Sequence, residues 1–228
     1  MPTPDSPGPA PVEPFAPDRE PPMPATQTFP MPERHRPRPH AAPWWIGYLL
    51  INPLRRLLQD PERMLRPHVA PGRTVLEVGP GMGYFTLPIA RMVGRHGRVI
   101  AIDCQERMLE TLARRAATAG LDRTVTTQTC RPHSLGVGRL ADAVDLVVAI
   151  NVVHEAPDPE RMIGEMARTL RPGGRLLLSE PRGHVGRDMF LWQYGLCREA
   201  GLEACDWPRL TGQRSVVMAK SATADRRG

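Results

Sequence analysis

The chain of 228 residues is long enough for one well-packed domain and an appendage. Its formal charge is +6, and Lys220 is the one lysine among 30 basic residues. The arginines occur singly or in pairs along the chain, whereas a nucleic-acid surface would concentrate positive charge on one face, so we expect no nucleic-acid partner.

Cysteine spacing and hydropathy indicate a soluble, cytoplasmic protein. The chain has 4 cysteines without a C-x-x-C pair, and a domain of this size does not need disulfides. No segment reaches the roughly 18 apolar residues of a membrane span, and no secretion signal is recognisable. We therefore expect free thiols, no stable membrane insertion, and a monomer or homodimer.

The N-terminal part divides into a tail and a helical segment. Residues 1–43 contain more than half of the 27 prolines and few aliphatic residues, so we predict a disordered tail, and residues 221–228 form a second one. Residues 44–68 are predicted to form amphipathic helices. Their aromatic members are Trp44, Trp45 and Tyr48. This segment either covers the site as a lid, packs as ordinary core, or lies on a membrane surface.

The sequence DPERM occurs at residues 60–64 and again at residues 158–162. Asp at the N-cap, Pro at the first helical position and Glu in the first turn together favour the start of a helix. We interpret the two copies as two helix starts and not as an internal repeat.

Strand and helix patterns alternate from residue 69 to residue 220. We predict strands at 74–78, 98–102, 124–129, 144–150, 174–180, about 202–207, and 214–219. We predict helices at 84–93, 105–119, 159–170 and 187–200. This alternation predicts an α/β domain with a Rossmann-like, mostly parallel sheet and helices on both faces. Ligands of such sheets bind beyond the carboxyl ends of the strands.

The segment VLEVGPGMGYFT, residues 75–86, has the pattern E-x-G-x-G-x-G from Glu77 to Gly83. A dinucleotide fold needs its third glycine at the position that Tyr84 occupies, and no P-loop lysine follows, so a phosphate ligand is disfavoured. Taken alone, the pattern is equally consistent with a tight turn between a strand and a helix. Pro88 is tolerated only near the start of a helix, which supports a helix beginning here.

A second signal follows in VIAID, residues 99–103, a buried strand that ends in an acid. An acid at this place accepts hydrogen bonds from both hydroxyls of a ribose. A glycine turn and a ribose acid without phosphate chemistry favour an adenosine ligand that lacks pyrophosphate. S-adenosylmethionine fits, because its amino-acid end can approach the glycine backbone and its ribose can meet Asp103.

Four segments in order resemble the motifs of the class I S-adenosylmethionine-dependent methyltransferases: VLEVGPGMGYFT, VIAIDCQERML, VDLVVAINVVHEAPDPERM and LRPGGRLLLSEP. The resemblance covers about residues 70–220 and is nearest to the small-molecule branch that includes the ubiquinone/menaquinone-biosynthesis and arsenite methyltransferases. It implies a seven-stranded sheet with an antiparallel last strand. It also implies S-adenosylmethionine as cofactor and methyl transfer to oxygen, sulfur or carbon of a small molecule. If the N-terminal aromatic residues close over the site, they favour an apolar acceptor.

The resemblance also implies cofactor-binding residues. The methionine end of the cofactor would be lined by Glu77, Gly79, Gly81, Gly83 and Tyr84, and the ribose and adenine by Asp103, Cys104, Gln105 and Met108. Asn151 would lie near the transferred methyl group. The family often has an acid after the third strand, facing adenine. Cys130 and Arg131 stand there instead, so backbone atoms would make that contact.

Two histidines are candidates for the site that binds the methyl acceptor. The fourth-strand segment lacks the (Asp/Asn)-Pro-Pro-aromatic signature of enzymes that methylate amino groups of DNA or glutamine. His154 is a natural base for an acidic hydroxyl or thiol, although it could equally cap the following turn. His184 either faces the acceptor or is an ordinary loop residue. With the N-terminal aromatics and Tyr84, these side chains are the predicted acceptor site, and no metal-ligand spacing occurs.

Two other functions remain open from the sequence. A basic face in the fold would favour a methyltransferase acting on RNA or protein. A blocked acceptor pocket would favour a protein that binds S-adenosylmethionine without catalysis.

Overall fold

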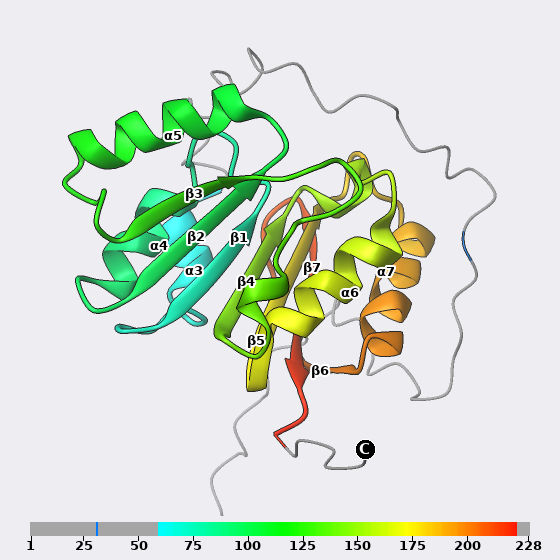
Figure 1. Cartoon of the computed structure of the whole chain (residues 1–228). Helices are drawn as coiled ribbons and strands as arrows, with labels where there is room; N and C mark the ends of the chain where they lie inside the picture. The colour runs from blue at the N-terminus through cyan, green and yellow to red at the C-terminus, as the bar shows by residue number, and fades with distance from the viewer. Residues whose placement is uncertain (1–30, 32–58, 223–228) are drawn as a thin grey trace, which may run out of the picture.

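Seven strands form one sheet in the order β3-β2-β1-β4-β5-β7-β6 in the computed structural model, which describes residue 31 and residues 59–222 (Figure 1). The strands are β1 (Thr74–Val78), β2 (Arg98–Asp103), β3 (Val125–Thr129), β4 (Val144–Ile150), β5 (Leu170–Pro181), β6 (Leu202–Asp206) and β7 (Gln213–Lys220). Strands β1 to β5 pair in parallel, and β7 runs antiparallel to both of its neighbours. The predicted fold class is confirmed, including the antiparallel last strand.

Helices cover both faces of the sheet (Figure 1). The described helices are α3 (Pro61–Leu65), α4 (Thr86–Val93), α5 (Glu106–Thr118), α6 (Pro159–Thr169) and α7 (Arg187–Glu199), with single 3₁₀ turns η1 (Gly138–Leu140) and η2 (Val153–Glu155). Helices α3, α4 and α5 contribute to one core cluster, and α6 and α7 contribute to the other. Every predicted helix from residue 84 onward is present, with ends shifted by one or two residues.

The central strands are apolar on both faces because each face packs on helices. In β1, Leu76 belongs to the core cluster under α6 and α7, while Val75 belongs to the cluster under α3, α4 and α5. Val147 and Val148 divide between the same clusters in β4. Buried parallel strands therefore read as continuous apolar runs, because successive side chains point to opposite faces.

Both copies of DPERM begin helices, as predicted. The Asp60 carboxylate accepts hydrogen bonds from the backbone of Glu62 and Arg63 at the start of α3. Asp158 accepts from the backbone of Arg161 at the start of α6, at 3.0 Å. These bonds satisfy backbone N–H groups that have no partner within the helix.

Apart from residues 31, 221 and 222, the predicted tails lie outside the described residues, as does most of the predicted N-terminal helical segment. The described remainder of that segment, α3, buries Met64 and Leu65 in the core cluster shared with α4. In the part of the chain from residue 59 to residue 222, no helix has both the length and the apolar character needed to cross a membrane.

The strand order changes direction at β1, and this places the site. The chain builds β1, β2 and β3 outward in one direction and then returns to place β4 on the other side of β1. Connections diverge at such a point and leave a crevice beyond the carboxyl ends of the strands. The sequence motifs described above end at this edge of the sheet.

Candidate active site

The glycine turn, residues 79–83, joins the carboxyl end of β1 to α4. Its three glycines all have positive φ, which other residues rarely adopt. A Cβ on Gly79 or Gly83 would lie within 2.6 Å of another side chain of the protein, whereas a Cβ on Gly81 would meet nothing within 4 Å. Gly79 and Gly83 therefore permit close packing of the turn, and Gly81 borders open space.

Asp103 is the last residue of β2, and its carboxylate lies against the glycine turn. One oxygen accepts a hydrogen bond from the Gly81 backbone at 3.2 Å, and the other accepts from the Gln105 backbone at 2.9 Å. Burial raises the pKa of Asp103, and the backbone donors oppose that shift. Each carboxylate oxygen has a further lone pair, so the group can still accept the two hydroxyls of a ribose.

Glu77 is buried beneath the same edge, with 3% of the residue exposed. Burial raises its pKa to about 7, the nearby Thr86 side chain opposes that shift, and the negative charge of Asp103 adds to it. Its Oε2 atom is buried without a hydrogen-bond partner among the described residues. A buried carboxylate in this state is stabilised by a cationic ligand, because a positive charge favours its ionised form.

Asn151 directly follows β4 and has a φ of 59°, a left-handed conformation in which asparagine is enriched. Its backbone N–H donates to the Ser179 carbonyl at 2.8 Å, which holds the end of β4 against β5. Its Oδ1 atom is buried and has no hydrogen-bond partner among the described residues. Because β1 and β4 are paired, Asn151 and Glu77 offer two unsatisfied acceptors at one edge of the sheet.

The ends of β2 and β3 adjoin where the resemblance places adenine. The Cys130 backbone donates to the Asp103 carbonyl at 3.0 Å. Cys104 is exposed, Met108 is buried, and Arg131 is exposed. Burial raises the pKa of the Cys130 thiol to about 12, so the thiol is neutral at physiological pH. Cys130 and Arg131 do occupy the positions after β3, without an acid beside them in the sequence.

His154 lies in η2, and its imidazole is bonded to a buried acid of the neighbouring strand. Its Nδ1 atom is 2.6 Å from Oε2 of Glu180, near the carboxyl end of β5. The His154 backbone N–H donates to the other oxygen of Glu180 at 3.0 Å. Glu180 is fully buried, whereas 16% of the His154 side chain is exposed. His154 is thus fixed at the same edge of the sheet as Asn151, which precedes it by three residues in the sequence.

Two other predicted acceptor residues lie around this edge. His184 is exposed in the loop after β5, with its ring centroid 6.1 Å from that of His154. Tyr84 follows the glycine turn, and its hydroxyl donates to the Gln59 carbonyl at 2.6 Å. Trp44, Trp45 and Tyr48 lie outside the described residues. Tyr84 thus connects the glycine turn to the beginning of the described chain.

The sequence reasoning missed two residues. Glu180 follows the apolar run LLLS, a position like those of Glu77 and Asp103, so its pattern was readable as a strand-end acid. Arg115 of α5 donates to the Met82 carbonyl and thereby supports the glycine turn. Arg115 gave no local signal, because it reaches the turn from 33 residues away in the sequence.

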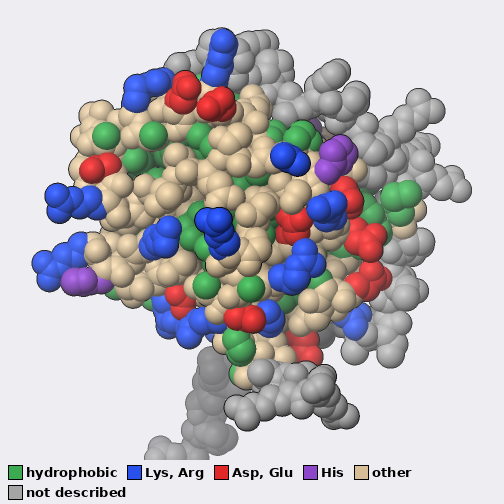
Figure 2. Space-filling model, viewed as in Figure 1, with side chains coloured by type: hydrophobic (Ala, Val, Ile, Leu, Met, Phe, Trp, Pro, Cys, Tyr) green, Lys and Arg blue, Asp and Glu red, His purple; other side chains and the backbone are tan. Residues whose placement is uncertain are grey.

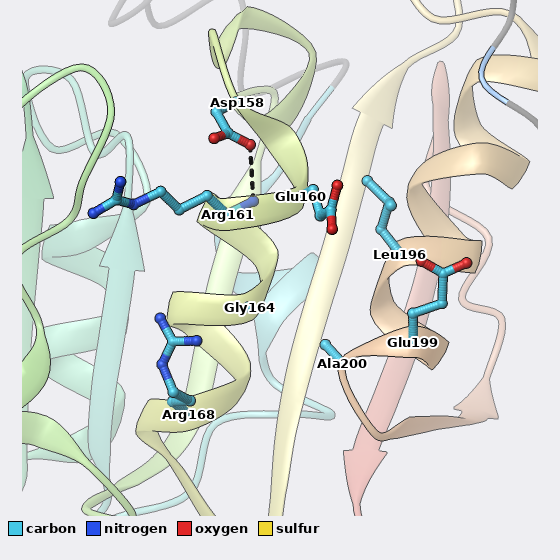
Figure 3. Close-up of a pocket in the computed structure, with 8 residues that line it drawn as sticks. All are labelled: Asp158, Glu160, Arg161, Gly164, Arg168, Leu196, Glu199 and Ala200. Carbon is cyan, nitrogen blue, oxygen red and sulfur yellow. Dashed lines mark hydrogen bonds between the residues drawn. The ribbon is translucent and has the colours of Figure 1, made fainter.

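A separate cleft of about 450 Å³ lies between α6 and α7 (Figure 3). Its lining consists of Asp158, Glu160, Arg161, Gly164, Arg168, Leu196, Glu199 and Ala200. The lining includes three acidic and two basic side chains, and none of the predicted site residues is among them. The face seen in Figure 2 also shows basic side chains interspersed with acidic and uncharged ones.

Within residues 59–222, no group of three His, Cys, Asp or Glu side chains could hold a metal ion.

The sheet order, the glycine turn and the acid that ends β2 together match the Rossmann-like fold of S-adenosylmethionine-dependent methyltransferases. The site fits that cofactor. Gly81 leaves space, Asp103 offers oxygens to a ribose, and the unsatisfied oxygens of Glu77 and Asn151 suit the ammonium of an amino acid.

Comparisons with known proteins agree. Residues 75–174 match the family described as methyltransferase domain. Arsenite methyltransferase of Halobacterium salinarum is 33% identical over 113 residues, which cover 49% of this chain and 28% of that protein. Demethylmenaquinone methyltransferase of Symbiobacterium thermophilum is 33% identical over 120 residues, covering 52% of this chain and 47% of that protein. The chain thus spans less than two thirds of the length of these relatives.

A solved structure supports the fold assignment. The S-adenosylmethionine-dependent methyltransferase from Aquifex aeolicus superposes with a TM-score of 0.68 at 24% identity, covering 78% of this chain and 98% of that one. The matched segment and the shared fold make the chain similar to the S-adenosylmethionine-dependent methyltransferases, whose cofactor is S-adenosylmethionine.

Proposed function

We propose that the protein transfers a methyl group from S-adenosylmethionine to a small, apolar molecule with an acidic hydroxyl or thiol. The observation that carries this proposal is the imidazole of His154, fixed by Glu180 at the sheet edge that also holds Gly81 and Asn151. An oriented imidazole beside the methyl-donor end supplies what an acceptor with a proton needs, namely a base.

The cofactor would be held from four strand ends, those of β1, β2, β3 and β4. Asp103 would bind the ribose, with Cys104, Gln105 and Met108 beside the ribose and adenine, and the backbone of Cys130 and Arg131 would face the adenine. Gly81, Glu77 and Asn151 would bind the amino-acid end. When bound, S-adenosylmethionine supplies a methyl group on a sulfonium, which needs no further activation as a leaving group.

The protein mainly has to align the acceptor and remove its proton. Alignment of two reactants can supply roughly 7 to 11 kcal/mol of barrier reduction in favourable cases. The acceptor oxygen or sulfur would bond to the methyl carbon while the bond from that carbon to the sulfonium breaks, and its electron pair would remain on sulfur. The acceptor's proton passes to His154, so charge and atoms balance.

The surface charge of the protein and the aromatic residues proposed around the acceptor both favour a small acceptor over a polymer. Basic side chains on the face in Figure 2 are interspersed with acidic ones, which gives a polyanion no continuous basic surface there. Tyr84 lies at the glycine turn, and we propose that Trp44, Trp45 and Tyr48 complete an aromatic wall around the acceptor. Aromatic walls suit flat or lipophilic molecules.

The test is a screen of phenols, quinols, thiols and arsenite with methyl-labelled cofactor, run beside total RNA and denatured protein. Transfer of label to a phenol, quinol or thiol supports the proposal. With that acceptor, His154→Ala should lower kcat by roughly 10²-fold or more and leave cofactor affinity intact. Label found only in RNA or protein would contradict the small-molecule assignment, and unchanged kcat in His154→Ala would contradict the base.

A further inference from the structure

We propose that Glu180 is a positioning residue that sets which nitrogen of His154 accepts the proton; this role rests on the function proposed above. Glu180 touches neither the acceptor nor the cofactor in this account. It acts through the imidazole ring, from the end of the neighbouring strand.

The contact is a two-point clamp. One carboxylate oxygen accepts from the His154 backbone at 3.0 Å, and the other lies 2.6 Å from Nδ1 of the same residue. The first bond holds the η2 turn at a fixed height above the sheet, and the second fixes the rotation of the ring. Bonds of this length to a charged group are the strong, geometrically selective ones.

The clamp also decides the tautomer. An ionised carboxylate can only accept, so Nδ1 must donate and carries the proton of the neutral ring. The lone pair then resides on Nε2, the nitrogen on the opposite side of the ring, which becomes the proton acceptor. Once Nε2 has taken the proton, the adjacent negative charge stabilises the resulting imidazolium. A buried acid behind a catalytic imidazole performs the same two tasks in hydrolytic triads.

Other titratable groups near the ring are placed differently. They include Glu155 of η2, whose Oε1 is 3.9 Å from Nε2, and His184, whose ring centroid is 6.1 Å from that of His154. A separation of 3.9 Å is too long for a hydrogen bond. Glu155 and His184 are also exposed to solvent, whereas Glu180 is fully buried. The 2.6 Å contact with Glu180 is therefore short enough to choose the tautomer, whereas the 3.9 Å separation from Glu155 is not.

Glu180 also supports the turn, so the test has to separate positioning from folding. Glu180→Gln does so, because its amide oxygen can still accept from the His154 backbone. Its NH₂ group would face Nδ1 and donate to it, which moves the ring proton to Nε2 and removes the accepting lone pair. Glu160→Gln, an exposed glutamate of α6 that lines the cleft in Figure 3, is the matched control.

The experiment combines ¹⁵N NMR of the histidine ring with steady-state kinetics on two acceptors, one protonated and one ionised at the assay pH. The ring signals of His154 are assigned as those that disappear from the spectrum of His154→Gln. In wild type, the neutral ring should carry its proton on Nδ1. In Glu180→Gln the proton should move to Nε2. We expect kcat to fall roughly 10²-fold or more on the protonated acceptor and much less on the ionised one. Binding of S-adenosylhomocysteine should be unchanged.

The acid limb of the kcat profile should move to lower pH in Glu180→Gln, because a nearby negative charge favours the imidazolium. Glu160→Gln should match wild type in every measurement. A wild-type ring with its proton on Nε2 overturns the proposal, and this readout does not depend on whether Glu180→Gln folds. Equal loss on both acceptors also overturns it. Full kcat in Glu180→Gln with kcat lost in His154→Ala refutes the role of Glu180 alone, whereas full kcat in His154→Ala refutes the proposed base as well.

Discussion

Glu77 couples the stability of the folded chain to the ligand it would bind. Its pKa rises from 4.5 to about 7 because the carboxyl is buried. The folded state therefore holds this proton more tightly than the unfolded state does. Stability from this group is fully present below pH 4.5 and is lost as the pH rises through 7, since the buried group must then ionise. A shift of this size corresponds to about 3 kcal/mol.

Replacement of Glu77 by glutamine should stabilise the ligand-free protein and weaken cofactor binding. The gain in melting temperature over wild type should be absent near pH 4.5 and grow until the pH passes 7. Affinity for S-adenosylmethionine should fall most at pH 8, where wild-type Glu77 is ionised and can pair with the ammonium. Melting curves and calorimetry at pH 5.5 and pH 8 measure both effects. A variant that binds as tightly as wild type at pH 8 would show that Glu77 does not contact the cofactor.

At the level of single residues, the sequence predicted the positions better than the contacts. Asp103 and Asn151 were identifiable because each follows a buried apolar strand, and parallel strands end at one edge. The Glu180–His154 contact was not, because its partners are 26 residues apart and their bond depends on how far η2 turns back over β5. Sequence position alone does not give that angle.

Among the elements, the glycine turn contains one glycine that packs against a helix, Gly83, and one that borders the space proposed for the ligand, Gly81. Gly83 has a φ of +86°, and a Cβ there would lie 2.3 Å from Leu112 Cδ1 of α5. Gly81 has a φ of +54°, and a Cβ there would enter open space. A non-glycine residue in this left-handed region costs roughly 1–2 kcal/mol by itself. The two positions should therefore respond differently to alanine.

Gly83→Ala should lower the melting temperature more than Gly81→Ala, because it adds a steric conflict to the backbone cost. Gly81→Ala should reduce S-adenosylhomocysteine affinity by roughly tenfold or more while costing only about 1 kcal/mol of stability, since its methyl group would occupy the ligand space. Gly138→Ala is the control, because its φ is not positive and a Cβ would meet nothing within 4 Å. Equal affinity in Gly81→Ala and wild type would place the cofactor elsewhere.

The helices and strands were largely predictable, because local sequence patterns determine where most of them begin and end. Asp60 and Asp158 cap the helices that their sequence pattern predicted, and the bounds of the central strands β1, β2 and β4 follow from buried apolar runs. The start of β5 at Leu170, four residues before the predicted one, did not, because residues 171–173 after it are exposed. Long-range support was not predictable. The bond from Arg115 to the glycine turn and the cleft between α6 and α7 both depend on how helices pack, and no local pattern encodes that packing.

For the whole molecule, the decisive feature is that four strand ends converge. The edge formed by β1, β2, β4 and β5 brings Glu77, Asp103, Asn151 and Glu180 to one side of the sheet, although they are spread over 104 residues. The parallel sheet order produces this convergence, and the helices on both faces hold it rigid. A methyl donor and an acceptor can therefore meet at a single edge.

Titration calorimetry of S-adenosylhomocysteine into wild type and Asp103→Ala tests this account most directly, with Asp122→Ala, an exposed acid between α5 and β3, as control. The account predicts binding by wild type and by the control. Asp103→Ala should bind at least roughly tenfold more weakly, because each hydrogen bond to a charged group contributes about 1.5–3 kcal/mol. No binding by wild type, or equal binding by Asp103→Ala, would contradict the assignment of this edge as the cofactor site.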